Sequence, residues 1–201
     1  DGMGDRPNFE LDHKTPLQAA NLPVINQLAK EGQCGTADPV KPGIVASTVS
    51  GTLAILGYDP LEKTVARGVV EALGCGMKIN IGDVAFRGNW ATLDEKGLIV
   101  DRRAGRIREG INELALSITG QKIDNVRIDV AAGTEHRIAG VIRGPGLQDC
   151  VSGSDPGDRF HSGIIPRPIK PLNKNNQKCL RTADLLNLFE LKAREILAKH
   201  P

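Results

Sequence analysis

The stretch VRIDVAAGTEHRIAGVIRG, residues 126–144, decides what kind of fold this chain contains. Val, Ile and Ala dominate both of its halves, and the AAGTE between them has the small and polar residues typical of a turn. The stretch therefore predicts two neighbouring strands joined by a turn.

The residues before this pair predict two further strands and a helix. VAFRGNWATLD, residues 84–94, and GLIVD, residues 97–101, read as strands. Residues 107–119 read as an amphipathic helix, because apolar side chains recur there at helical spacing. Those positions are Ile107, Ile111, Leu114, Ala115 and Ile118. Together with the strand pair they predict an α+β unit over residues 80–165.

The two ends of the chain are predicted to be mainly helical. Helical patterns or short apolar runs cover residues 16–31, 49–57, 64–73 and 182–199. Pro23 is expected to divide the first of these into a turn and a helix. GIIPRPIKPL, residues 163–172, contains three prolines and reads as an extended connector. We expect an α/β body made of residues 1–76 and the C-terminal helix, with a small domain inserted into it.

Composition and charge narrow the classes of function. In a chain of 201 residues, 40% apolar content suits an ordinary soluble core. The net charge of +2 is too small to indicate nucleic acid or a membrane surface as the main partner. No apolar window approaches the roughly 18–20 residues of a membrane span, and no signal-peptide pattern opens the chain. We expect a cytoplasmic protein.

The four cysteines are expected to be buried or incidental thiols in a reducing cytoplasm. They are Cys34, Cys75, Cys150 and Cys179, with no CxxC spacing among them. This pattern fits neither a zinc site nor the dense disulfides of small secreted domains.

An arginine-rich run, DRRAGRIREG at residues 101–110, is the most informative chemical feature. If these residues form a helical turn, Arg102 and Arg103 converge with Arg106. Guanidinium groups bind phosphate and carboxylate oxygens in pairs, which lysine cannot do. The run therefore predicts an anion site, and the alternative is the solvated start of a helix.

Residues on the predicted strands could join these arginines. Arg87 and Arg137 lie on neighbouring predicted strands, and His136 could donate to the same anion, although a lone strand histidine is more often structural. Clustered cations at a helix start oppose the helix dipole, at a cost of about a few tenths of a kcal/mol each. Their presence together favours the anion site.

Two further segments could contribute chemistry. DGMGD, residues 1–5, begins with a carboxylate followed by glycine and could bind a divalent cation, or it could be an exposed turn. GIVASTVSGT, residues 43–52, offers several hydroxyl groups near a predicted helix start. One of them could attack phosphorus if a metal or a base lowered its pKa, or it could cap the helix.

Several motifs, in this order, resemble those of the archaeal-type cofactor-independent phosphoglycerate mutases of the alkaline phosphatase superfamily. They are DGMGDRP, HKTPLQAA, LAKEGQCG, DPVKPG, LAILGYDP, DVAFRGNWATLDEKGLIVDRRAGRI, EHR and SGSDP. The resemblance runs along nearly all of the chain and implies an α/β fold with three parts. These are part of an alkaline-phosphatase-like core (1–78), an inserted α+β cap domain that binds substrate (79–168), and a connector and helix returning to the core (169–201).

The resemblance also implies a function. Members of the family interconvert 2-phosphoglycerate and 3-phosphoglycerate in glycolysis through a phosphoenzyme. They use two divalent metal ions (Mn, Mg, Co or Zn) and no 2,3-bisphosphoglycerate. Asp1 matches the first metal-binding aspartate, and an ungapped count places Thr48 at the nucleophilic serine. The positions expected to bind the substrate are Arg87, Asn89, Asp101, Arg102, Arg103, Arg106, His136 and Arg137.

The sequence departs from the family pattern in two places. The family's serine and the aspartate after it correspond to Thr48 and Val49, and a motif downstream becomes KTVARGVV. The family's remaining metal ligands follow the cap domain, in a part that these 201 residues do not contain. We therefore expect no mutase activity from these residues alone.

Two alternatives stay open. The chain could represent a paralogous phosphohydrolase or phosphomutase acting on another phosphorylated or phosphonate acid. It could instead represent a non-catalytic relative that keeps the anion-binding cap. In each case the expected partner is a small phosphorylated acid, and neither nucleic acid nor a membrane. The sequence predicts no oligomeric state.

Overall fold

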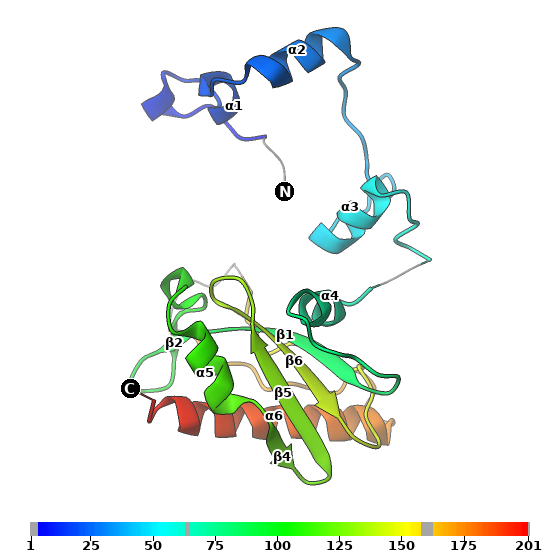
Figure 1. The fold of residues 1–201 in the computed structure, drawn as a ribbon, viewed down its shortest axis with the longest axis vertical. Coiled ribbons are helices and arrows are strands. Elements are labelled where there is room, and N and C mark those ends of the chain that lie inside the picture. Colours follow the sequence, from blue (N-terminus) through cyan, green and yellow to red (C-terminus); the bar gives the residue numbers. More distant parts are fainter. Residues whose placement is uncertain (1–3, 63–64, 158–162, 201) are drawn as a thin grey trace. The chain divides into compact units, whose positions relative to one another are not determined.

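A computed structural model describes residues 4–62, 65–157 and 163–200 of the chain. The chain divides into two compact units, Asp1–Val65 and Ala66–Pro201 (Figure 1). The predicted mixture of helices and strands is confirmed, and all the strands found among the described residues belong to the second unit.

The first unit consists of short helices joined by loops. Its helices are α1 (Pro16–Ala19), α2 (Pro23–Glu31) and α3 (Thr48–Ile55), and a 3-10 turn at Phe9–Leu11 precedes them. The break between α1 and α2 confirms the division expected at Pro23. Ser47 caps α3, because its hydroxyl accepts a hydrogen bond from the Ser50 N–H at 3.1 Å while the Ser50 hydroxyl accepts from the Ser47 N–H at 2.8 Å.

The apolar side chains of this unit are exposed. Val24 and Leu28 of α2 are 68% and 64% exposed, and Ile55 of α3 is 81% exposed. Among the described residues of α1, α2 and α3, none is buried. Local hydrogen bonds, with side-chain caps at α1 and α3, therefore define these helices, and no hydrophobic core forms within the described part of the unit.

A four-stranded antiparallel sheet in the order β1-β6-β5-β4 organises the second unit (Figure 1). Its strands are β1 (Val84–Asn89), β4 (Gln121–Ile123), β5 (Val126–Ala132) and β6 (Arg137–Arg143). The strand pair predicted at residues 126–144 is confirmed as the central hairpin of β5 and β6. β2 (Thr92–Leu93) and β3 (Ile99–Asp101) form a separate two-stranded sheet. No pattern in the sequence predicts the three residues of β4.

Helices cover both faces of the four-stranded sheet. They are α4 (Arg67–Gly74), α5 (Ile111–Ile118) and α6 (Gln177–Leu197). Ile138 and Ile142 of β6 pack in the core that α5 and α6 share with the sheet. Ala139 and Val141 point the other way and pack with Ala72 of α4. Because alternate residues point to opposite covered faces, β6 is a continuous apolar run in the sequence.

The starts of α5 and α6 differ most from the predicted ones. α5 begins at Ile111 and not at Ile107, because Gly110 before it has a positive φ of 70°. α6 begins at Gln177, ahead of the predicted start at Thr182. The Asn176 side chain caps it by accepting a hydrogen bond from the Lys178 N–H at 2.9 Å.

The position of α6 corrects a prediction. We expected this helix to belong with the first 76 residues, but Leu185, Leu186 and Phe189 lie in the hydrophobic core of the second unit. The domain boundaries at residues 78 and 168 stay a prediction. Neither α6 nor any other helix in the described part of the chain is long and apolar enough to span a membrane.

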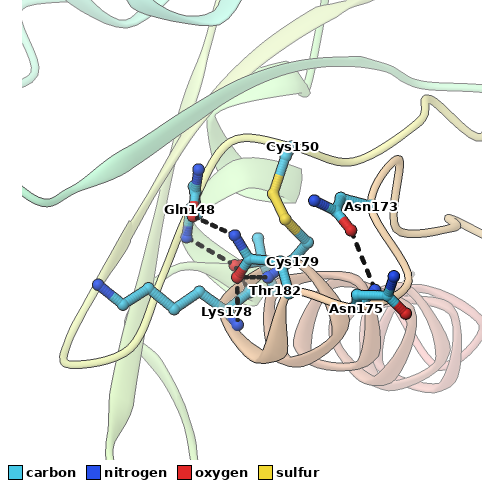
Figure 2. The surroundings of a disulfide bond; sticks show 8 residues. Gln148, Cys150, Asn173, Asn175, Lys178, Cys179 and Thr182 are labelled. Atoms are coloured by element: carbon cyan, nitrogen blue, oxygen red, sulfur yellow. Dashed lines mark hydrogen bonds between the residues drawn. A yellow bond between two sulfur atoms is a disulfide. The ribbon is translucent and has the colours of Figure 1, made fainter.

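Cys150 and Cys179 form a disulfide bond (Figure 2). Their Cα atoms are 5.3 Å apart, within the usual range for disulfides. The bond ties the segment after β6 to the first turn of α6, and in the next turn the Thr182 hydroxyl accepts from the Gln148 N–H at 3.0 Å. The prediction of unpaired thiols is wrong for this pair, whose separation of 29 residues matches no spacing motif. Cys34 and Cys75 are free thiols.

Candidate anion-binding site

The candidate site lies at the end of the sheet where β1 stops and β6 starts. Asn89, the last residue of β1, pairs with Arg137, the first residue of β6. Arg87 precedes Asn89 by two residues and so shares its face of the sheet. Its Nε lies 3.6 Å from a carboxylate oxygen of Glu71 on α4. The sheet therefore presents these three polar side chains on the face that α4 covers.

His136 joins the site from the turn between β5 and β6. Its carbonyl oxygen accepts a hydrogen bond from the Trp90 N–H at 2.7 Å, which extends the pairing of β1 and β6 by one step. His136 is only 6% exposed. Burial lowers the pKa of its imidazole, as do the charges of Arg137 and other arginines, and Glu135 opposes them. His136 is therefore neutral at neutral pH and offers the site an imidazole without a charge.

Residues 101–106 form a left-handed turn that positions Arg102 and Arg103. The φ angles of Ala104, Gly105 and Arg106 are 44°, 63° and 56°. The run is therefore not the right-handed helical turn on which Arg102 and Arg103 would converge with Arg106. The Asp101 carboxylate accepts from the N–H groups of Arg103 and Gly105 at 2.8 and 2.6 Å, and these bonds lower its pKa. Left-handed backbone costs a non-glycine residue about 1–2 kcal/mol, and such strain is concentrated at ligand sites.

The carboxylate of Asp155, a residue of the SGSDP motif that was not among the predicted site residues, lies among these arginines. Its two oxygens accept hydrogen bonds from Nε and Nη2 of Arg102 at 3.1 and 2.6 Å. The Asn89 amide donates to the same carboxylate at 3.2 Å, and the Gly157 N–H does so at 2.9 Å. Burial raises the pKa of Asp155, but the hydrogen bonds from Arg102 and Gly157 lower it further, so the net change is downward. Asp155 is ionised at neutral pH.

Four buried polar atoms of this site have no hydrogen-bond partner among the described residues. They are Asn89 Oδ1, Trp90 Nε1, His136 Nδ1 and Arg137 Nε. Leaving such an atom unpaired costs about 1–3 kcal/mol, and folded proteins keep few of them. Trp90 packs in the core shared with α5 and α6, so its side chain points away from the face that carries Asn89 and Arg137. The unpaired atoms of Asn89 and Arg137 indicate a place on that face where a ligand completes the hydrogen bonding. Trp90, like Asp155, lies in a quoted motif but was not among the predicted site residues.

Arg106 lies at the edge of the site, near Glu135. The Arg108 guanidinium donates to Glu135 at 2.5 Å and lowers the pKa of that carboxyl, and the charge of Arg106 adds to this effect. The turn after β3 thus faces the turn before β6. The predicted residues that the structure brings into this region are Arg87, Asn89, Asp101, Arg102, Arg103, Arg106, His136 and Arg137.

The structure does not place the other two predicted site residues relative to this cluster. Thr48 is the first residue of α3 in the first unit, directly after the cap residue Ser47. Asp1, the predicted metal ligand, lies outside the described residues. Across residues 4–62, 65–157 and 163–200, no group of three or more His, Cys, Asp or Glu side chains could hold a metal ion. These residues by themselves do not fit a two-metal site.

Both the sequence and the fold have known relatives. Residues 29–201 match the family described as 2,3-bisphosphoglycerate-independent phosphoglycerate mutase. Proteins of that name from Picrophilus torridus and Methanobrevibacter smithii are 47% identical over 201 residues and 43% identical over 204 residues. Each comparison covers 100% of this chain and 48% of the relative. The solved structure of the cofactor-independent phosphoglycerate mutase from Thermoplasma acidophilum matches 99% of this chain with a TM-score of 0.63 and 41% identity. The chain spans about half the length of these relatives, 51% in the case of that structure.

Proposed function

Because the chain belongs to the 2,3-bisphosphoglycerate-independent phosphoglycerate mutase family, we propose that its second unit binds a phosphoglycerate and that the whole protein interconverts 2-phosphoglycerate and 3-phosphoglycerate in glycolysis. The observation that carries the proposal is the gathering of arginines around buried polar atoms that lack partners. No 2,3-bisphosphoglycerate is required, in agreement with the name of the relatives.

The arginine cluster has the electrostatics of a site for an oxyanion. Burial lowers the pKa of Arg87, and so does the nearby charge of Arg137. Two guanidinium groups that repel each other and are partly shielded from water are stabilised electrostatically when an anion lies between them. A phosphoglycerate carries a phosphate and a carboxylate, and guanidinium groups bind both in pairs of hydrogen bonds. The guanidinium groups that this proposal assigns to the substrate are those of Arg87, Arg102, Arg103, Arg106 and Arg137.

We assign the transfer of the phosphoryl group to Thr48. Its hydroxyl oxygen bonds to phosphorus while the bond between phosphorus and one substrate hydroxyl oxygen breaks. That substrate oxygen receives the proton which Thr48 loses, and the reverse step delivers the phosphoryl group to the other hydroxyl. The proposal includes two divalent metal ions for the whole protein. No step is assigned to them, because the described residues do not form a metal site.

A second candidate function is hydrolysis or transfer on a different phosphorylated or phosphonate acid. Val49 favours it, because an aspartate is expected after the nucleophile and this chain has none there. Changing Thr48→Ser together with Val49→Asp in the whole protein distinguishes the two. Mutase activity should rise if the phosphoglycerates are the substrates and should not change if the substrate is another acid.

Calorimetric titration of the 201-residue chain with 3-phosphoglycerate tests the anion site directly. We expect saturable binding, and we expect Arg102→Ala to weaken it. Arg127→Ala is the matched control, because it removes the same charge from an arginine that bonds Asp129 near the opposite end of the sheet. Equal affinity in the original chain and in the Arg102 variant would show that the cluster does not bind the substrate.

A further inference from the structure

Asp155 determines which way the Asn89 side chain faces. An ionised carboxylate only accepts hydrogen bonds, and in a carboxamide only the NH₂ group donates them. The contact of 3.2 Å between Asn89 and Asp155 must therefore be made by Asn89 Nδ2. As a result the carbonyl oxygen of the Asn89 side chain, Oδ1, points away from Asp155.

Asn89 Oδ1 is a buried acceptor that no described residue satisfies. Two of the atoms that share this condition, Trp90 Nε1 and Arg137 Nε, bear hydrogen and only donate. The third, His136 Nδ1, lies 4.0 Å from Glu135 and can be either a donor or an acceptor. Phosphate and carboxylate oxygens satisfy donors, but they cannot satisfy Asn89 Oδ1. A ligand hydroxyl can.

We propose that Asn89, oriented by Asp155, accepts a hydrogen bond from the ligand's hydroxyl group and makes this site selective for phosphorylated hydroxy acids. The inference rests on the proposed function, because it concerns the same anion site. Both phosphoglycerates carry one free hydroxyl beside their phosphate and carboxylate. Asn89 is the residue that recognises this hydroxyl, and Asp155 is a positioning residue that acts through Asn89.

The segment that leads into Asp155 is anchored at three residues, as a positioning role requires. The Ser152 N–H donates to the Lys170 carbonyl oxygen at 2.8 Å. The Ser154 hydroxyl donates to Glu190 of α6 at 2.5 Å. The Cys150 disulfide holds the start of the same segment to α6 (Figure 2). The fold therefore fixes the position of the Asp155 carboxylate, and the hydrogen bond from Asn89 to this carboxylate fixes the orientation of the Asn89 side chain.

The test compares two ligands that differ by a single hydroxyl. 3-Phosphoglycerate and 3-(phosphonooxy)propanoate have the same phosphate and carboxylate, but the second has no hydroxyl. We expect the original chain to bind 3-phosphoglycerate about tenfold more tightly, the scale of one hydrogen bond. Asp155→Asn should reduce that ratio to near one, because a carboxamide at this position can itself donate and no longer fixes the Asn89 amide. Asn89→Ala should do the same by removing the acceptor.

Asp129→Asn is the matched control, since it neutralises another carboxylate bonded to arginines, Arg127 and Arg143, outside the site. In this variant the ratio of the affinities for the two ligands should equal that of the original chain. Circular dichroism confirms that each variant is folded. If the original chain binds both ligands equally, the inference is overturned and the proposed function stands. If it binds neither, both fail. If Asp155→Asn weakens both ligands without changing their ratio, Asp155 has only a structural role and the inference is overturned.

Discussion

Arg102 and Asp155 are 53 residues apart in the sequence and form a two-point ion pair, with Nε–Oδ1 and Nη2–Oδ2 distances of 3.1 and 2.6 Å. The pair joins the left-handed turn after β3 to the segment that follows β6, so two distant loops make one side of the site. The Asp155 side chain is 44% exposed, and water therefore screens the pair. The ion pair mainly positions the Arg102 guanidinium and the Asn89 amide. Its contribution to the free energy of unfolding is small.

Arg106→Ala is expected to weaken the binding of 3-phosphoglycerate by about 1.5–3 kcal/mol, the range for hydrogen bonds to charged groups. Arg106 is close enough to Glu135 for its charge to help lower the pKa of that carboxyl. Arg108→Ala is a close control, because Arg108 is 76% exposed and bonds Glu135. Calorimetric titration checks the difference. Equal losses in both variants would mean that the site responds to total charge and that Arg106 makes no specific contact.

The central hairpin could be predicted from the sequence because β5 and β6 are apolar runs separated by a recognisable turn. The start of α5 could not. Ile107 continues the apolar stripe at helical spacing, but the bonds from Arg103 and Gly105 to Asp101 hold the chain in a left-handed turn just before it. Hydrophobic periodicity carries no information about such backbone bonds.

The candidate site could be predicted as a set of residues more readily than as a geometry. Clustered arginines indicate an anion from their chemistry alone. Asp155 could not be placed, because nothing local to it shows which arginine it meets across 53 residues. Trp90 is apolar in most of its surface, and only its burial shows that its N–H lacks a partner among the described residues. The disulfide could not be predicted either, because Cys150 and Cys179 come together only in the folded chain.

His136 is expected to make folding less favourable as the pH falls below 6.5. Burial, followed by the charge of Arg137, lowers its folded-state pKa below the ordinary value of 6.5, so the unfolded chain takes up the proton first. The contribution of neutral His136 to the free energy of unfolding is fully present above pH 6.5. It is lost progressively as the pH falls toward the lower, folded-state pKa. Thermal unfolding between about pH 7 and about pH 5 measures this slope.

Two comparisons isolate the contribution of His136. His136→Asn should unfold with a shallower pH dependence over that range, because the titrating group is gone. Adding 3-phosphoglycerate to the original chain should also reduce the slope, since a bound anion raises the pKa of a neighbouring imidazole. Identical slopes for the original chain and the variant would show that His136 does not titrate differently in the two states.

Replacing both Cys150→Ser and Cys179→Ser is expected to lower the free energy of unfolding by about 2–4 kcal/mol, because a bond across 29 residues restricts the unfolded chain. Thermal unfolding with and without a reductant checks this. The reductant should destabilise the original chain and leave the double variant unchanged. Cys34→Ser with Cys75→Ser is the control and should keep the response to reductant. A double variant as stable as the oxidised original would count against the bond.

Gly140→Ala is expected to destabilise the second unit by about 1–3 kcal/mol, the usual cost of overpacking a core. Gly140 pairs with Phe86 across β1 and β6, and a Cβ on it would come within 2.1 Å of the Phe86 ring. That ring cannot easily retreat, because it packs against Phe189 of α6 with ring centroids 6.0 Å apart. The free energy of unfolding in urea measures the cost. Gly153→Ala is the matched control, since a Cβ there meets nothing within 4 Å. Because β1 and β6 also carry Asn89 and Arg137, the Gly140 variant should bind 3-phosphoglycerate more weakly. If the Gly140 and Gly153 variants have equal stability and equal affinity, the sheet accommodates the added Cβ and this prediction is wrong.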